Sequence, residues 1–172
     1  MSIKNHYRGI ASMKRIGLIL LLCLTTAGCA TDYHRIGLGG GFEETQLSEN
    51  IWNVTFVGNG YTSSLRAADL AILRSADLAY MNGYKFFILT SSFDSINYST
   101  YTTPVTATTN YQGNTAYTNI QGGHTYIISK PSQSNTVVMF KEKPRGITNV
   151  YDADFVCKSI GKKYDIQCGV IP

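Results

Sequence analysis

The residue types that carry most catalytic and metal-binding chemistry are scarce in this chain. Its 172 residues include only three histidines, at positions 6, 34 and 124, and four cysteines. A zinc site needs three or four His, Cys or carboxylate ligands close together, and no such cluster is visible in the sequence. The sequence also has no G-x-S-x-G nucleophile elbow and no C-x-x-C redox motif. We therefore expect a protein that is not an enzyme and that uses no metal and no cofactor.

Long hydrophobic runs are also missing. The longest nearly apolar stretch, residues 16–24, has nine residues, whereas a helix that spans a bilayer needs about 20. The small residues 25–28 follow it. Four basic residues precede it, namely Lys4, Arg8, Lys14 and Arg15. A basic start, a short apolar core and a small-residue end are typical of a secretory signal peptide, so we expect one over residues 1–28, with Met1 or Met13 as its start.

The end of this segment has a specific form. Its last residues, Ala27 and Gly28, stand directly before Cys29, and the pattern resembles the lipobox of bacterial lipoproteins, although Thr26 stands where Leu is usual. The resemblance implies cleavage between Gly28 and Cys29 and a covalent lipid on Cys29, whose thiolate is the nucleophile. Ala30 follows in place of Asp, which by the same resemblance implies the periplasmic face of the outer membrane. The alternative is a plain signal peptide with an incidental cysteine.

The charge of the chain changes when residues 1–28 are removed. The whole sequence has 15 basic and 11 acidic residues, and four basic residues but no acidic ones lie in the removed segment. A neutral mature chain has no basic footprint for nucleic acid, so we expect no nucleic-acid partner. Its hold on a membrane would come from acyl chains, which contribute about 0.8 kcal/mol per buried CH₂.

The mature chain predicts a flexible tether over residues 29–47 and one α+β domain over residues 48–172. Four glycines between positions 37 and 41 indicate the tether. We expect a mainly antiparallel sheet of about five or six strands, one long alanine-rich helix and a short C-terminal helix. The alternation of Trp52, Val54 and Phe56 with polar residues predicts the first strand.

Residues 61–84 carry the strongest helix signal. Thr62, Ser63 or Ser64 can cap its start, and Asn82-Gly83 supplies its end. The spacing predicts a buried face of Leu65, Ala68, Ile72, Ala76 and Ala79. It predicts an exposed face of Arg66, Asp69, Arg74 and Asp77, whose ion pairs would each be worth only tenths of a kcal/mol. A buried strand follows at residues 84–91.

This stretch carries a family resemblance. It contains a G-x-G-Y-[ST] turn at residues 58–62, the helix motif R-[AS]-A-[ED]-L at residues 74–78, and N-G-[YF] at residues 82–84. With the lipobox, these motifs resemble an uncharacterised group of small proteobacterial lipoproteins, the Caulobacter-type family. The resemblance covers about 50 residues beyond the lipobox; it implies a fold and a location but no activity.

Charge is absent from one long segment. From Ser95 to Ser129 there is no Asp, Glu, Lys or Arg, and Thr, Asn, Ser, Tyr and Gly predominate. The composition predicts an extended hairpin or a partly ordered loop. Such a surface can pair with another chain by strand addition, because it lacks the edge lysines that block pairing; a glycan-binding aromatic surface is the alternative. The candidate partner contacts are Tyr98, Tyr101, Tyr111 and Tyr117.

The C-terminal part predicts two strands, at residues 124–130 and 135–143, joined by the linker 131–135 as an antiparallel hairpin. A helix capped by Asp152 follows, with Phe155, Val156 and Ile160 as its apolar stripe. Cys157 and Cys168 are the two cysteines left after removal of residues 1–28 and acylation of Cys29. Because the periplasm oxidises thiols, we expect a disulfide between them; two buried thiols are the alternative.

Two kinds of function remain open. The first is a non-enzymatic envelope or interaction module at the outer membrane, in one version an accessory subunit of a membrane-spanning assembly such as a secretion system. The second is a lipoprotein that binds a small ligand or glycan. A protein partner would favour the first, and a retained small molecule would favour the second.

Overall fold

The computed structural model describes residues 30–170 as one antiparallel sheet covered by two helices, with a separate hairpin at its far end. The elements are β1 (Gly41–Ser48), β2 (Ile51–Val57), α2 (Ser64–Met81), β3 (Phe86–Thr102), β4 (Thr106–Gln112), β5 (Thr115–Gln121), β6 (Thr125–Phe140), β7 (Tyr151–Asp152) and α3 (Ala153–Tyr164). The predicted α+β class, with one long helix and a short C-terminal one, is confirmed.

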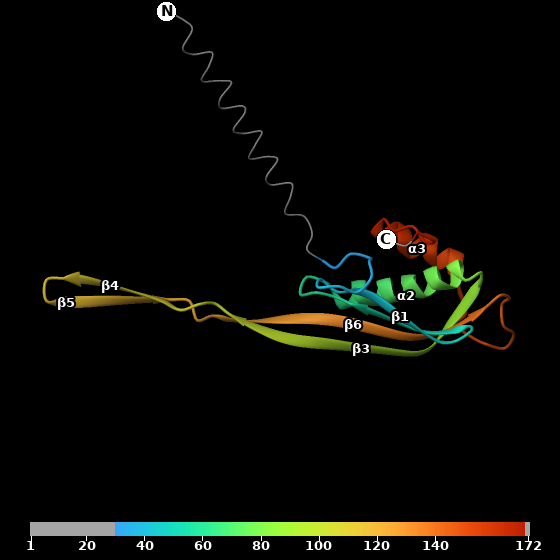
Figure 1. The fold of residues 1–172 in the computed structure, drawn as a ribbon, viewed down its shortest axis with the longest axis horizontal. Coiled ribbons are helices and arrows are strands. Elements are labelled where there is room, and N and C mark those ends of the chain that lie inside the picture. The colour runs from blue at the N-terminus through green and yellow to red at the C-terminus, as the bar shows by residue number, and fades with distance from the viewer. Residues whose placement is uncertain (1–29, 171–172) are drawn as a thin grey trace, which may run out of the picture.

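The five-stranded sheet has the order β1-β2-β6-β3-β7, and every neighbouring pair is antiparallel. β2 and β3 therefore run in the same direction with β6 between them, and α2 connects them. Figure 1 shows α2 lying on one face of the sheet and α3 lying beyond α2. Val54, Phe56 and Phe87 point into the core between sheet and helix and are fully buried.

Local signals place the ends of α2 where the sequence predicts them. Ser63 is the N-cap, and its side chain accepts a hydrogen bond from the Arg66 backbone N–H. The helix ends at Asn82, and Gly83 follows with a φ of +74°, a left-handed conformation that favours glycine.

The predicted faces of α2 are wrong in part. Ala76 and Ala79 are buried as expected, but Leu65 is 64 % exposed. Arg74 and Asp77, which we expected on the solvent face, are among the most buried residues in the structure. The reason is that α2 lies between the sheet and α3, while the chain near residues 33–44 covers another side. A helix covered in this way buries far more than one stripe.

Arg74 is the centre of a buried cluster of charges. Its Nη1 donates to Asp77 Oδ2 at 2.8 Å and its Nη2 donates to Glu44 Oε1 at 3.0 Å. The guanidinium also lies 4.1 Å from the ring centroid of Phe42. Asp77 accepts two further hydrogen bonds, from the Tyr33 hydroxyl at 2.7 Å and from the Gly169 backbone N–H at 2.7 Å. Arg74 and Asp77 of the motif at residues 74–78 therefore connect α2 to residues 33–44 and to the C-terminal tail at Gly169.

The electrostatics of this cluster favour a neutral phenol at Tyr33. Burial, and then the negative charge of Asp77, raise the pKa of the Tyr33 hydroxyl far above its usual value. The hydroxyl therefore keeps its proton and remains a hydrogen-bond donor to Asp77.

The prediction of a flexible tether over residues 29–47 is wrong from Thr31 onward. Thr31, Tyr33 and Phe42 are buried, and Gly41–Ser48 forms the edge strand β1. The glycines serve a tight turn: a Cβ on Gly40 (φ +95°) would lie 2.2 Å from the Val57 carbonyl oxygen. Gly41 (φ +123°) is similarly close to the His34 carbonyl oxygen, so close backbone approach accounts for Gly40 and Gly41.

The prediction of two C-terminal strands joined by a linker is also wrong. Residues 125–140 form the single strand β6, which pairs with β3 from Phe86↔Phe140 to Thr102↔Thr125. Pro131 does not interrupt it. The Pro131 carbonyl accepts a hydrogen bond from the Gly58 N–H at 2.7 Å. The N–H and C=O of one residue point to the same side of a strand, so the N–H that proline lacks would point toward β2, which ends at this position. Proline is tolerated at such an edge position.

We expect Arg74→Leu to lower the free energy of unfolding by about 3–5 kcal/mol, because it leaves the buried Asp77 carboxylate without its counter-ion. Lys158→Leu is the control, since it removes an exposed ion pair with Asp154 and should leave stability unchanged. Urea denaturation of the purified proteins measures both. Equal stability of the two variants would show that the cluster does not hold the fold together.

Candidate interaction surface

The uncharged segment Ser95–Ser129 forms one long projection, which we call the arm. It consists of the outer parts of β3 and β6 and the whole of β4 and β5. Figure 1 shows the arm leaving the body at one end, with neither helix lying over it. Every residue of β4 and β5 is exposed. The side chains of the outer arm are therefore not packed in the core of the protein.

The arm has two hydrogen-bonded parts joined by a bend. In the inner part β3 pairs with β6 as far as Thr102↔Thr125. At the bend, the Thr103 N–H donates to the His124 carbonyl at 2.9 Å. Gly122 has a φ of +97°, and a Cβ there would lie 1.9 Å from the Pro104 carbonyl oxygen. Only glycine lets these two backbone segments approach each other so closely.

The outer part is a hairpin with two different faces. β4 and β5 pair from Thr106↔Gln121 to Gln112↔Thr115, and a two-residue loop begins with Gly113 at a φ of +64°. Because side chains alternate along a strand, one face carries Ala107, Thr109, Tyr111, Ala116, Thr118 and Ile120. The opposite face carries Thr106, Thr108, Asn110, Gln112, Thr115, Tyr117, Asn119 and Gln121.

The four tyrosines predicted as partner contacts all lie on this arm and are exposed. They divide between its parts: Tyr98 and Tyr101 lie on β3, Tyr111 on β4 and Tyr117 on β5. The sequence prediction missed the other large hydrophobic side chains around them, although their alternation with polar residues was a signal for them. All ten side chains, four predicted and six additional, are 42–79 % exposed. The additional ones are Phe93, which lies just before the arm, and Ile96, Val105, Ile120, Tyr126 and Ile127.

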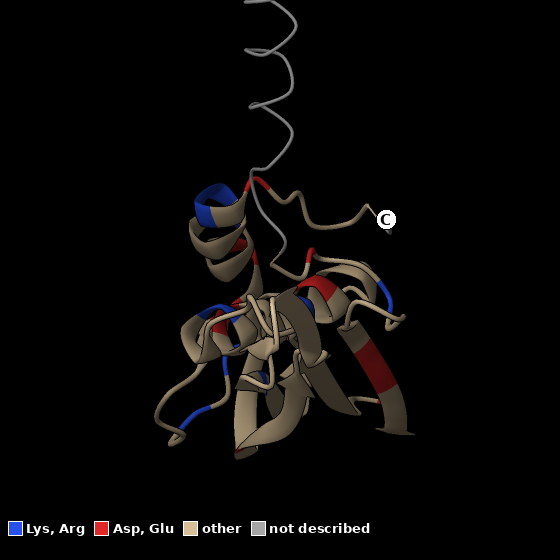
Figure 2. Cartoon of the chain, turned by 90° about the vertical axis from the view of Figure 1, so that its left-hand side faces the viewer, with Lys and Arg blue, Asp and Glu red and all other residues tan. Residues whose placement is uncertain are grey.

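Charge and exposure are distributed differently over the body and the arm. Figure 2 looks along the molecule from the end where the arm projects, and the coloured Lys, Arg, Asp and Glu residues lie on the body. An exposed surface rich in aromatic and β-branched residues and without charge is characteristic of an interaction site.

The arm also lacks the features that protect a sheet edge. A two-stranded hairpin is marginally stable in water unless further strands or a helix cover it, and within residues 30–170 the outer hairpin pairs with no third strand. Edge strands are commonly blocked by lysine, proline or a bulge. β4 and β5 contain none of these, so their backbone edges are open to pairing.

The turn at residues 58–62 joins the base of the arm to the start of the described chain. A Cβ on Gly60 would lie 2.5 Å from the Ile128 side chain, so the turn lies directly against β6. The Thr31 hydroxyl accepts from the Asn59 N–H at 2.9 Å, and the Thr31 N–H donates to Thr62 Oγ1 at 3.0 Å. The chain that follows Cys29 is therefore held beside the base of the arm.

A hollow of about 450 Å³ lies at the same place, and its lining residues are Asn59, Gly60, Tyr61, Ile127, Ile128, Ser129 and Lys130. Tyr61 is 77 % and Ile127 is 73 % exposed. Its size and apolar lining are those of a site for a small apolar molecule.

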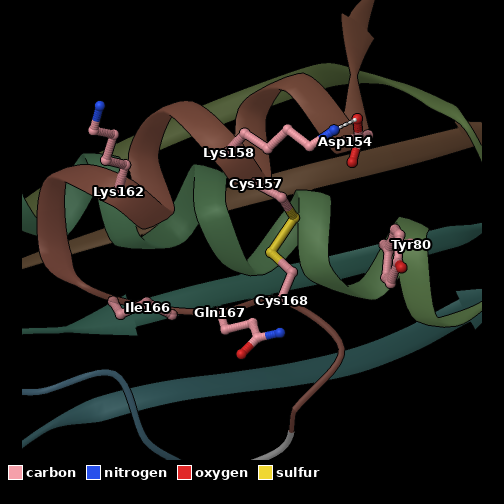
Figure 3. Close-up of a pocket in the computed structure, with 8 residues that line it drawn as sticks. All are labelled: Tyr80, Asp154, Cys157, Lys158, Lys162, Ile166, Gln167 and Cys168. Atoms are coloured by element: carbon pink, nitrogen blue, oxygen red, sulfur yellow. Dashed lines mark hydrogen bonds and ion pairs between the residues drawn. A yellow bond between two sulfur atoms is a disulfide. The ribbon is translucent and has the colours of Figure 1, made fainter.

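A second hollow, of about 310 Å³, surrounds the link between α3 and the C-terminal tail. Figure 3 shows the Cys157–Cys168 disulfide at its centre, with Tyr80 of α2 on one side and the Lys158–Asp154 ion pair on another. The sulfur atoms are 2.05 Å apart and the Cα atoms 5.9 Å apart. Lys162 points outward, and Lys158 is paired with Asp154 at 2.6 Å.

The remaining predicted site residues, Gly28 and Cys29, lie outside the described residues. Neither of the helices α2 and α3 is long and apolar enough to cross a membrane. Within residues 30–170, no three His, Cys, Asp or Glu side chains come together in a way that would hold a metal ion.

We compared the chain with family models, with curated proteins and with solved structures, and none of them matches it.

We expect the double variant Cys157→Ser/Cys168→Ser to lose about 3 kcal/mol of unfolding free energy, because the disulfide closes a short loop in the unfolded chain. The bridged residues are 11 apart in sequence. Urea denaturation measures the loss, and wild-type protein treated with a reductant should behave as the double variant does. Unchanged stability in both samples would show that the bond does not constrain the unfolded chain.

Proposed function

We propose that this protein is a lipid-anchored module of the bacterial envelope that acts by binding another protein through its arm. The anchor would be a lipid on Cys29 at the periplasmic face of the outer membrane, as the lipobox pattern implies. The body would serve as a stable base and would carry out no chemistry. The single observation that supports the binding role is the arm itself: a long, uncharged and exposed hairpin with open edges.

The contrast between body and arm supports this proposal further. In the body, exposed ion pairs such as Lys158–Asp154 at 2.6 Å give an ordinary solvated surface. In the arm, Tyr111 and Tyr117 are 79 % and 59 % exposed without any charge near them in sequence. Tyrosine is enriched in protein interfaces because it buries a large area while losing little conformational freedom.

The position of the first described residues, next to Cys29 in sequence, fits an anchored protein. Thr31 is fixed beside the turn at residues 59–62, next to the base of the arm. A lipid on Cys29 would hold this end of the body at the membrane with only a short connection. One version of the proposal is therefore an accessory subunit that reaches from the membrane into a larger membrane-spanning assembly.

A small-ligand role is the second candidate, and the hollow beside Tyr61, Ile127 and Ile128 favours it. The two candidates differ in what the solubilised protein carries. A bound protein would support the arm as the binding site, and a small molecule retained by a monomer would support the hollow.

We expect a photoreactive amino acid at Tyr111 to give protein adducts in intact cells, because this exposed side chain belongs to β4, a strand with an open edge. The matched control is the same amino acid at Tyr80, which is 54 % exposed but lies on α2 in the body. Immunoblotting of the irradiated cells measures the adducts. Adducts from Tyr80 alone, or none from either position, would contradict the proposed role of the arm.

We expect Cys29→Ser to leave an unlipidated precursor that keeps residues 1–28, because the thiolate is the group that receives the lipid. Intact-mass analysis and membrane fractionation measure both effects. A variant that still matured and still fractionated with outer membranes would show that Cys29 is not the attachment point.

A further inference from the structure

We propose that the occupant of the arm's open edge is a second copy of this chain, which pairs antiparallel with strand β4 about Thr109. The inference rests on the proposed function, in which the arm is a binding surface, and it names the partner. The proposed pairing joins two outer hairpins into a four-stranded sheet with the order β5-β4-β4-β5, and the two bodies lie at its opposite ends.

The absence of charge is the first argument for a second copy. A twofold interface brings each patch against the same patch of the other copy, so any single charge near the axis meets a like charge. Strand addition between charged edges is disfavoured for this reason. The nearest charged residues in sequence are Asp94 and Lys130, both at the base of the arm, so two arms can approach without repulsion.

The register of the outer hairpin is the second argument. In a hairpin closed by a two-residue loop, the pair next to the loop exchanges backbone hydrogen bonds, and hydrogen-bonded and non-bonded pairs then alternate. On this pattern the N–H and C=O groups of Ala107, Thr109 and Tyr111 point away from β5. The Thr109 and Thr118 hydroxyls lie 2.9 Å apart, as expected for a non-bonded pair, whose side chains are closer together.

A twofold axis at Thr109 uses these outward groups fully. Thr109 then faces Thr109 of the second copy, and Ala107 faces its Tyr111, which provides about six backbone hydrogen bonds. In this register the odd-numbered residues of one β4 lie opposite odd-numbered residues of the other. Each face of one hairpin therefore continues into the same face of the second. The large Tyr111 ring meets the small Ala107 side chain, a favourable cross-strand combination.

Strand β4 is favoured over β5 by what pairing covers. Tyr111 is the most exposed large hydrophobic residue of the arm, at 79 %, and it lies on β4. Pairing through either edge turns a marginal two-stranded hairpin into four strands, so this gain favours self-pairing, and the exposure of Tyr111 is what favours β4. An anchor beside the base of each arm would hold the copies in one membrane and so raise their effective concentration.

The test compares Thr109→Cys with Thr118→Cys in the full-length protein, oxidised in intact cells and analysed on non-reducing gels. The two threonines are cross-strand neighbours on one face, so they form a matched pair. Thr109→Cys tests pairing through β4, and Thr118→Cys tests pairing through β5. Thr109 and its twin would be hydrogen-bonded partners about 5.5 Å apart, within the range that a disulfide spans. Two Thr118 residues would be separated by three strand spacings, about 14 Å.

We expect Thr109→Cys to give at least about tenfold more disulfide-linked homodimer than Thr118→Cys, since a disulfide requires Cα atoms within about 7 Å. The unmodified protein controls for its native cysteines. Equal or greater dimer from Thr118→Cys would overturn the pairing through β4. No homodimer from either variant would overturn self-association. In that case the masses of the Tyr111 adducts decide separately on the proposed function, because adducts with other proteins would preserve it and their absence would end it.

Discussion

The body of this protein depends on one buried positive charge. An unpaired guanidinium in the interior would be prohibitively costly, so Arg74 imposes the presence of Glu44 and Asp77 around it. Asp77 in turn holds Tyr33 near the start of the described chain and Gly169 near its end. The cluster thus ties both ends of the domain to α2. Hydrophobic burial alone, being non-directional, would not specify which segments meet there.

The molecule thus divides into a body, whose apolar core and buried charges pack against one another, and an arm, whose outer side chains stay exposed. The body has a core between sheet and α2, a disulfide at its tail and paired buried charges. The arm continues the strands of the same sheet past the helices, where nothing in residues 30–170 packs on its outer hairpin. A well-packed base with an exposed, uncharged extension is suited to presenting a strand edge at a distance from the body.

Elements with strong local signals could be predicted from the sequence. Ser63 and Asp152 cap their helices because a short side-chain oxygen next to free backbone N–H groups acts locally. The alternation around Val54 and Phe56 correctly predicted a half-buried strand. The composition of residues 95–129 favoured an extended hairpin or a partly ordered loop, and the structure has the hairpin. The continuity of β6 through Pro131 was missed, because it depends on where the neighbouring strand β2 ends.

By itself, then, the sequence determined the class of the fold, the caps and turns of its elements and the uncharged character of the arm, all of which follow from neighbouring residues. Only the tertiary structure decided which side of α2 is buried, because burial depends on the segments that cover a helix and not on its own periodicity. The same holds for the glycine-rich start, which the sequence alone indicates to be flexible but which Thr31 and Phe42 pack into the body. Long-range pairing also decided that the tyrosines of the arm stay exposed, since the helices cover the sheet only over the body.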